Sequence, residues 1–141
     1  MTETEKAYIA GFIDGEGSIG FRKTHSERGY YDTTVRLRVT QCSREVLDWI
    51  KIVTDIGSVR QWARCSNKHQ SRFEWYCSGK NAIALLKLLY PYLLVKKPQA
   101  SLVFRFEDTM VGQGNLLSVE QKEKRMILRE AMDSLMTHRR T

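Results

Sequence analysis

Residues 8–17 read Tyr-Ile-Ala-Gly-Phe-Ile-Asp-Gly-Glu-Gly, and they decide how the rest of the sequence is interpreted. Apolar side chains at positions 8, 9, 12 and 13 follow the spacing of an amphipathic helix. A second stripe on the same helix consists of small side chains that another backbone can approach closely, namely Ala7, Gly11 and either Asp14 or Gly15. The last two glycines of the stretch predict the end of the helix, because glycine is disfavoured inside helices and favoured just beyond them.

Two acids lie at the predicted C-terminal end of this helix. Asp14 and Glu16 sit where the helix dipole leaves partial negative charge, so a carboxylate there is destabilising unless a positive charge meets it. A bound divalent cation would supply that charge. An ordinary packed helix with a glycine-rich turn is the alternative that this stretch alone leaves open. A calcium-binding EF-hand loop starting at Asp14 is excluded, because Ile19 and His25 replace its required glycine and closing glutamate.

The composition indicates one ordinary domain with a polyanionic partner. The chain has 141 residues, with 23 Lys and Arg against 16 Asp and Glu, and a net charge of +7. We expect a single domain with a core over about 5–110 and a C-terminal helix over about 118–137. Neither a long apolar stretch nor a signal segment is found, which predicts an intracellular protein with no membrane partner. Three cysteines without a CxxC pair indicate reduced thiols.

The segments after residue 17 predict an α+β domain. Side chains alternate between apolar and polar with the period of half-buried strands over residues 18–23, 30–41, 58–64 and 72–77, with a hairpin tip at 24–29. Helical spacing and caps predict helices over about 43–56, 80–90, 98–110 and 118–136. Four strands of this kind form one antiparallel sheet with helices on its apolar face.

The polar face of that sheet is predicted to carry an unusual charge distribution. Its outward strand residues are mostly cationic or aromatic: Arg22, Arg36, Arg38, Arg60, Trp62, Arg64, Arg72 and Tyr76. Lys23, Arg28 and Lys68 add to them near the hairpin tips, and Glu74 is the only acid at the strand positions assigned outward. A solvated face usually mixes the two signs, so this asymmetry favours a nucleic-acid surface over a plain solvated one.

Residues 9–17 are similar to the signature of the LAGLIDADG homing endonucleases, with Ile9 in place of the leading leucine and Glu16 as the second acid. The resemblance covers about residues 7–107. It implies an αββαββα core whose four-stranded antiparallel sheet forms a saddle on DNA, with C-terminal helices added. It also implies that Glu16 is catalytic and holds a divalent metal, Mg²⁺ or another cation such as Mn²⁺, with the Gly15 carbonyl as an extra ligand.

Only one copy of the motif is present, which implies a homodimer that cuts both strands of a long, near-palindromic DNA site and leaves 3′ overhangs. The expected interface is the motif helix, through Ala7, Ala10, Gly11 and Asp14. The expected DNA contacts are the outward residues above together with Glu74, and the hairpin tips reach the outer base pairs. A chain of 141 residues favours an intron-encoded protein, with intron RNA as a candidate partner.

Two more positions match the periphery of the family's active site. Gln41 resembles the glutamine that orders the water or metal shell, and Lys96 resembles a basic residue near the scissile phosphate. Lys97 competes with Lys96 for this role, and a solvated lysine is the alternative for both. The family's arginine shortly after the glutamine is replaced by Glu45, with Arg44 one residue earlier.

Two other functions remain open from the sequence. A DNA- or RNA-binding maturase or regulator that does not cut is the main alternative, although the presence of Glu16, Gln41 and Lys96 favours cleavage. An interaction module without a nucleic-acid role is disfavoured by the arginine-rich face.

Overall fold

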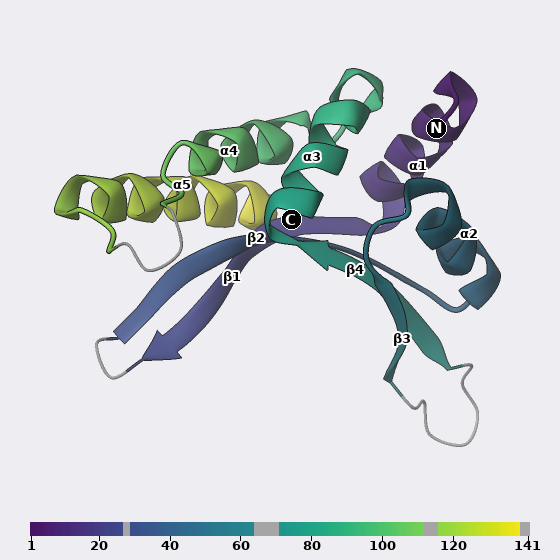
Figure 1. The fold of residues 1–141 in the computed structure, drawn as a ribbon, viewed down its shortest axis with the longest axis horizontal. Coiled ribbons are helices and arrows are strands. Elements are labelled where there is room, and N and C mark those ends of the chain that lie inside the picture. The colour runs from purple at the N-terminus through teal and green to yellow at the C-terminus, as the bar shows by residue number, and fades with distance from the viewer. Residues whose placement is uncertain (27–28, 64–70, 112–115, 139–141) are drawn as a thin grey trace.

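The computed structural model (Figure 1) describes residues 1–26, 29–63, 71–111 and 116–138, except for the side chains of residues 23–26, 29–33, 62–63 and 137–138. The elements follow one another as α1 (Glu3–Glu16), β1 (Gly17–Ser26), β2 (Gly29–Gln41), α2 (Arg44–Thr54), β3 (Ser58–Ala63), β4 (Arg72–Ser78), α3 (Gly79–Leu89), the 3₁₀ turn η1 (Tyr90–Tyr92), α4 (Lys97–Glu107) and α5 (Val119–His138). The predicted α+β class and αββαββα order are confirmed.

The strands form one antiparallel sheet in the order β1-β2-β4-β3. Figure 1 shows the helices above the sheet, while the β1–β2 and β3–β4 hairpins bend downward on opposite sides. The sheet is therefore saddle-shaped, and its underside is the face that the helices leave uncovered.

The core lies between the sheet and the helices, as the alternation predicts. Val35, Leu37 and Val39 of β2 are fully buried against Leu85 and Leu86 of α3 and the other apolar helix residues. Between Val35 and Val39, every second residue of β2 therefore faces the helices, and the intervening arginines must point to the opposite face.

α1 is longer than its apolar stripe indicates. It begins at Glu3 behind a capping box formed by Thr2 and Glu5, and it continues through Gly15 to Glu16. Gly17 is the position that requires glycine, because a Cβ there would lie 2.7 Å from the carbonyl oxygen of Ile13. The chain thus turns directly from the motif helix into β1.

The first hairpin and the third strand also differ from the predicted pattern. β1 continues to Ser26, which pairs with Gly29, so most of the segment expected as a tip is strand. A register shift between Gln61 and Ala63 pairs Ala63 with Arg72 and interrupts the alternation expected for β3. The extension of β1 and the register shift in β3 both depend on backbone pairing, which the pattern of polar and apolar residues does not reveal.

α5 packs along α4 through a buried arginine. A capping box starts α5, since Gln121 N–H donates to Ser118 Oγ at 3.1 Å and Ser118 N–H donates to Gln121 Oε1 at 2.8 Å. Arg125 Nε donates to Thr109 Oγ1 at 2.8 Å, and the guanidinium lies 4.4 Å from the centre of the Phe106 ring. In the part of the chain that the structure describes, no helix has the length and apolar character needed to cross a membrane.

Candidate active site and nucleic-acid interface

The end of α1 brings the acidic motif residue beside the end of β2. Glu16 is exposed and is the last residue of the helix. The next residue, Gly17, pairs with Val39, so Glu16 lies at the end of the β1–β2 ladder. β2 continues two residues beyond this pair to Gln41, which pairs with Phe73 of β4. Gln41 is half-buried, and its Oε1 accepts the backbone N–H of Cys42 at 2.8 Å. The register therefore gathers two of the three predicted catalytic residues at one end of the sheet.

Lys96 joins this end of α1 from the segment before α4. Its side chain is only 2% exposed, and its Nζ donates to the Asp14 carbonyl oxygen at 2.7 Å. A cation at the last carbonyls of a helix opposes the partial negative charge there. The charge that the sequence assigned to a bound metal alone is thus supplied in part by Lys96.

The carboxylate of Asp14 holds the same segment in place. Its two oxygens accept the backbone N–H groups of Leu94 and Lys96 at 2.8 and 2.9 Å. Lys97 points elsewhere, with its Nζ 5.3 Å from the centre of the Tyr90 ring. Of the two competing lysines, Lys96 is the one that contacts the motif helix. The anchoring role of Asp14 was missed, because its partners are 80 and 82 residues away in sequence.

The positions that replace the family's arginine lie at the start of α2. Arg44 forms an ion pair with Asp48 at 3.4 Å, and its guanidinium lies 5.6 Å from the centre of the Phe73 ring. Glu45 is exposed and lines a groove beside α1. Arg44 is therefore held on α2, one turn before Asp48.

The oxygen donors at the end of α1 fit a hard cation. Among the described residues, no three His, Cys, Asp or Glu side chains lie together so that they could hold a metal ion. The ligands that one protomer offers at the end of α1 are therefore the Glu16 carboxylate and nearby backbone carbonyls. The last carbonyls of a helix have no intrahelical N–H partner, and that of Gly15 is among them. Carboxylate and carbonyl oxygens suit Mg²⁺ or Mn²⁺, whose remaining ligands are commonly water and phosphate.

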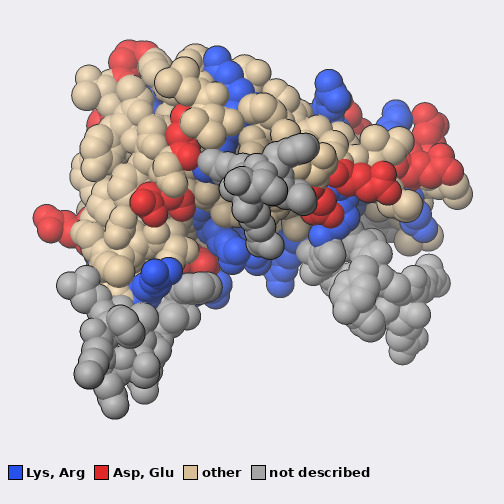
Figure 2. All heavy atoms as spheres, turned by 180° about the vertical axis from the view of Figure 1, so that it is seen from behind, with Lys and Arg blue, Asp and Glu red and all other residues tan. Residues whose placement is uncertain are grey.

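The uncovered side of the sheet carries the predicted cluster of cations, which we call the arginine face: Arg22, Arg36, Arg38, Arg60 and Arg72, with Glu74 and Tyr76. Figure 2 shows Lys and Arg gathered on the hollow underside of the molecule. Within the face, burial and the positive charge of Arg38 lower the pKa of Arg36 from its ordinary value. The crowding of like charges is the electrostatic condition that a polyanion relieves.

Glu74 does not lie at the surface of this face as the sequence predicts. It is 1% exposed, with Oε1 accepting a hydrogen bond from Arg60 Nη2 at 2.9 Å and Oε2 3.9 Å from Arg38 Nη1. The Arg60 guanidinium also lies 4.4 Å from the centre of the Tyr76 ring. Glu74 is therefore a buried counterion of the arginines. The side chains of five further predicted contacts lie outside the described residues: Lys23, Arg28, Trp62, Arg64 and Lys68.

The outer side of α1 presents small residues. Ala7, Gly11 and Gly15 are exposed, and a Cβ placed on either glycine would meet no atom within 4 Å. Ala10 is a correction to the expected interface, because its side chain is fully buried in the protomer core. Asp14 is half-buried and is engaged as described above.

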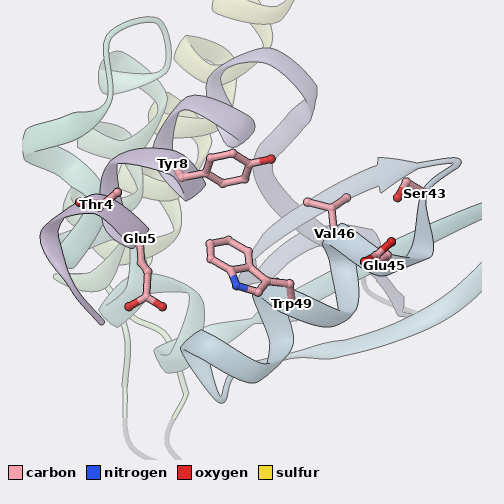
Figure 3. A pocket seen from close by; sticks show the side chains of 7 residues that line it. All are labelled: Thr4, Glu5, Tyr8, Ser43, Glu45, Val46 and Trp49. Atoms are coloured by element: carbon pink, nitrogen blue, oxygen red, sulfur yellow. The ribbon is translucent and has the colours of Figure 1, made fainter.

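A groove of about 470 Å³ runs beside this stripe, between α1 and α2 (Figure 3). Tyr8 is 54% exposed and meets Trp49 edge to face, with ring centres 5.3 Å apart. From the sequence alone, Tyr8 belongs to the apolar stripe of α1, and the groove was not predicted. The sequence feature that could have indicated this aromatic surface is the four-residue spacing of Tyr8 and Phe12, whose rings stack with their centres 6.2 Å apart.

The sequence matches the family model of the LAGLIDADG endonucleases over residues 9–108. A search of curated proteins found no significant match. The archaeal intron-encoded homing endonuclease I-Vdi141I, solved in complex with DNA, is similar in fold, with a TM-score of 0.78 and 22% identity over 94% of this chain and 84% of that one.

Two further solved structures share the fold at similar identity. The homing endonuclease I-CvuI, in complex with the I-CreI target in the presence of 2 mM Mg, gives a TM-score of 0.64 and 22% identity over 94% of this chain and 95% of that one. The structure of I-SmaMI bound to cleaved DNA gives a TM-score of 0.70 and 19% identity over 94% of this chain but only 48% of the I-SmaMI chain. The matched region therefore spans nearly all of the I-CvuI chain and about half of the I-SmaMI chain.

Proposed function

The chain belongs to the LAGLIDADG endonuclease family, and on this basis we propose that it is a site-specific DNA endonuclease that works as a homodimer. The observation that carries the proposal is the exposed carboxylate of Glu16, which α1 and the β1–β2 register hold at the edge of the arginine face. A carboxylate in that position is beside any duplex that follows the underside of the saddle. The catalytic unit is a single domain.

The homodimer is supported by the single motif and by the outer side of α1. Ala7, Gly11 and Gly15 allow a second helix to approach closely, and the exposed side chains of Leu94 and Val95 extend the apolar surface beyond the end of α1. A two-fold axis along this surface brings two Glu16 residues together, one for each strand. The matching DNA site is long and near-palindromic, and staggered cuts leave 3′ overhangs.

Mg²⁺ or Mn²⁺ is the proposed cofactor, with Glu16 and the Gly15 carbonyl as its protein ligands. Such an ion, when bound, stabilises charge that develops on the scissile phosphate and acidifies an attacking water. Gln41 would orient that water through its side-chain amide. Lys96 positions the end of α1 through the Asp14 carbonyl, and its positive charge would offset charge that develops on the reacting phosphate.

The proposal is tested with purified protein on a library of DNA sites, with Mg²⁺ or with EDTA, while light scattering measures the mass in solution. We expect metal-dependent cleavage of both strands at a near-palindrome by a dimer. Sequence-specific binding without cleavage would instead favour the maturase or regulator, and the next measurement would be binding to intron RNA. Absence of sequence-specific DNA binding would contradict the proposal.

A further inference from the structure

Glu74 is the feature of the arginine face that DNA contact does not explain. It sits at the middle of β4 and pairs in register with Arg60, while the neighbouring Tyr76 pairs with Arg38. Its carboxylate is buried beneath the two guanidiniums and cannot touch a DNA duplex without their displacement. Its contribution must therefore pass through the arginines.

A buried carboxylate of this kind restricts the side chains around it. An ion pair that excludes water requires good geometry, and losing either member leaves a buried charge without its partner. Arg60 is held from two sides, by the Glu74 Oε1 atom at 2.9 Å and by the Tyr76 ring at 4.4 Å. A long side chain fixed in this way loses less conformational entropy when it meets a base edge.

Glu74 also sets the charge of the face. Among the strand residues of the face whose side chains the structure describes, it is the only acid, and Arg38 and Arg60 form ion pairs with it. Attraction of cations to phosphate is independent of sequence, whereas oriented guanidiniums distinguish bases. The buried Glu74 carboxylate therefore lowers the sequence-independent attraction to phosphate and supports the discrimination of bases by the oriented guanidiniums.

We propose that Glu74 is a positioning residue for sequence recognition, which orients Arg60 and Arg38 toward the DNA and limits the affinity of the face for unrelated DNA. The inference rests on the proposed function, because it requires that this face read a DNA sequence.

The test is Glu74→Gln, which keeps the shape of the side chain and removes its charge. Binding to the selected target and to an unrelated duplex of equal length is measured over a range of salt concentrations. We expect the ratio of the two affinities to fall by at least about tenfold, the scale of one lost bidentate base contact. Binding to the unrelated duplex should strengthen, with a salt slope steeper by about one. Glu107→Gln is the matched control, because Glu107 pairs with Lys87 in the helical layer at 2.8 Å, and it should change neither quantity.

Glu74→Asp separates orientation from charge. The shorter carboxylate keeps the charge but does not reach Arg60 equally well, so the affinity ratio should fall while the salt slope stays the same. A ratio that is unchanged in both variants, or an equal loss of affinity for both duplexes, would overturn the inference. The Asp variant keeps the test decisive if Glu74→Gln does not fold. Failure of the wild type to prefer any sequence would instead refute the proposed function.

Discussion

The end of α1 and the arginine face use opposite strategies to present charge. At the end of α1, the exposed carboxylate of Glu16 belongs to a helix whose last turn is held by Asp14 and Lys96 against a segment distant in sequence. On the face, positive charge is distributed over arginines on four strands. A substitution at the end of α1 should therefore abolish most of the cleavage activity. A substitution of one arginine of the face should remove only part of the binding affinity.

The difference follows from what each region contributes in the proposed reaction. A group that acts on charge developing at one phosphate has no substitute within the protomer. Phosphate and base contacts are numerous, and each supplies a fraction of the binding free energy. Single substitutions in the two regions should therefore differ in the size of their effects.

The largest effect is expected for Glu16→Gln. The variant loses a metal-binding charge and no groove contact, so cleavage should fall by at least about 100-fold, the scale for removing one charge-stabilising group. Binding to the target should remain within about threefold, which is less than one typical base contact. Cleavage rates and equilibrium binding on the same duplex test both statements. Glu3→Gln, in the first turn of the same helix, is the matched control, and full activity of Glu16→Gln would refute the catalytic assignment.

Lys96→Met should weaken both the fold and the reaction. Its ammonium is buried against the Asp14 carbonyl, and the substitution leaves that carbonyl without this donor. We expect the free energy of unfolding to drop by about 1–3 kcal/mol and cleavage to decrease at temperatures where the variant is folded. Lys97→Met removes a cation that lies over the Tyr90 ring and should lower stability by about 1 kcal/mol or less. Equal effects of the two substitutions, measured by denaturant unfolding, would contradict the special position of Lys96.

Gly11→Ala distinguishes an isolated protomer from a dimer built on α1. In the protomer the added methyl meets no atom within 4 Å, so better helix propensity should stabilise it by up to about 1 kcal/mol. In a close helix pair the same methyl overpacks the contact by about 1–3 kcal/mol and weakens dimerisation by about 5- to 150-fold. Sedimentation over a range of concentrations measures the dimer. A more stable protein with an unchanged dimer would move the interface away from this stripe.

The sequence predicted what depends on local periodicity and failed where distant residues decide the outcome. Alternation placed Val35, Leu37 and Val39 in the core correctly, because the period of a strand fixes its two faces. The same alternation placed Glu74 outward, but it does not reveal that arginines from β2 and β3 cover it.

The motif helix shows the same division between local and distant information. Its apolar spacing predicted the helix, and its small residues predicted an open side at Gly11. Ala10 was assigned to that open side, although it faces the core, because small size alone does not specify a direction. The bonds from Asp14 to Leu94 and Lys96 depend on tertiary contact, and no local pattern encodes them.

The smallest effect is expected for a single arginine at the margin of the face. Arg72 is exposed at the start of β4, where Ala63 is its pairing partner on β3. If Arg72 contacts a phosphate, Arg72→Ala should weaken binding to the target and to unrelated DNA alike, and reduce the salt slope by about one. If it contacts a base, the loss should be confined to the target, by about 1–3 kcal/mol. Arg105→Ala, an exposed arginine on α4 in the helical layer, is the control for the change in net charge. Equal effects of the Arg72 and Arg105 substitutions would mean that binding depends on total charge rather than on the arginine face.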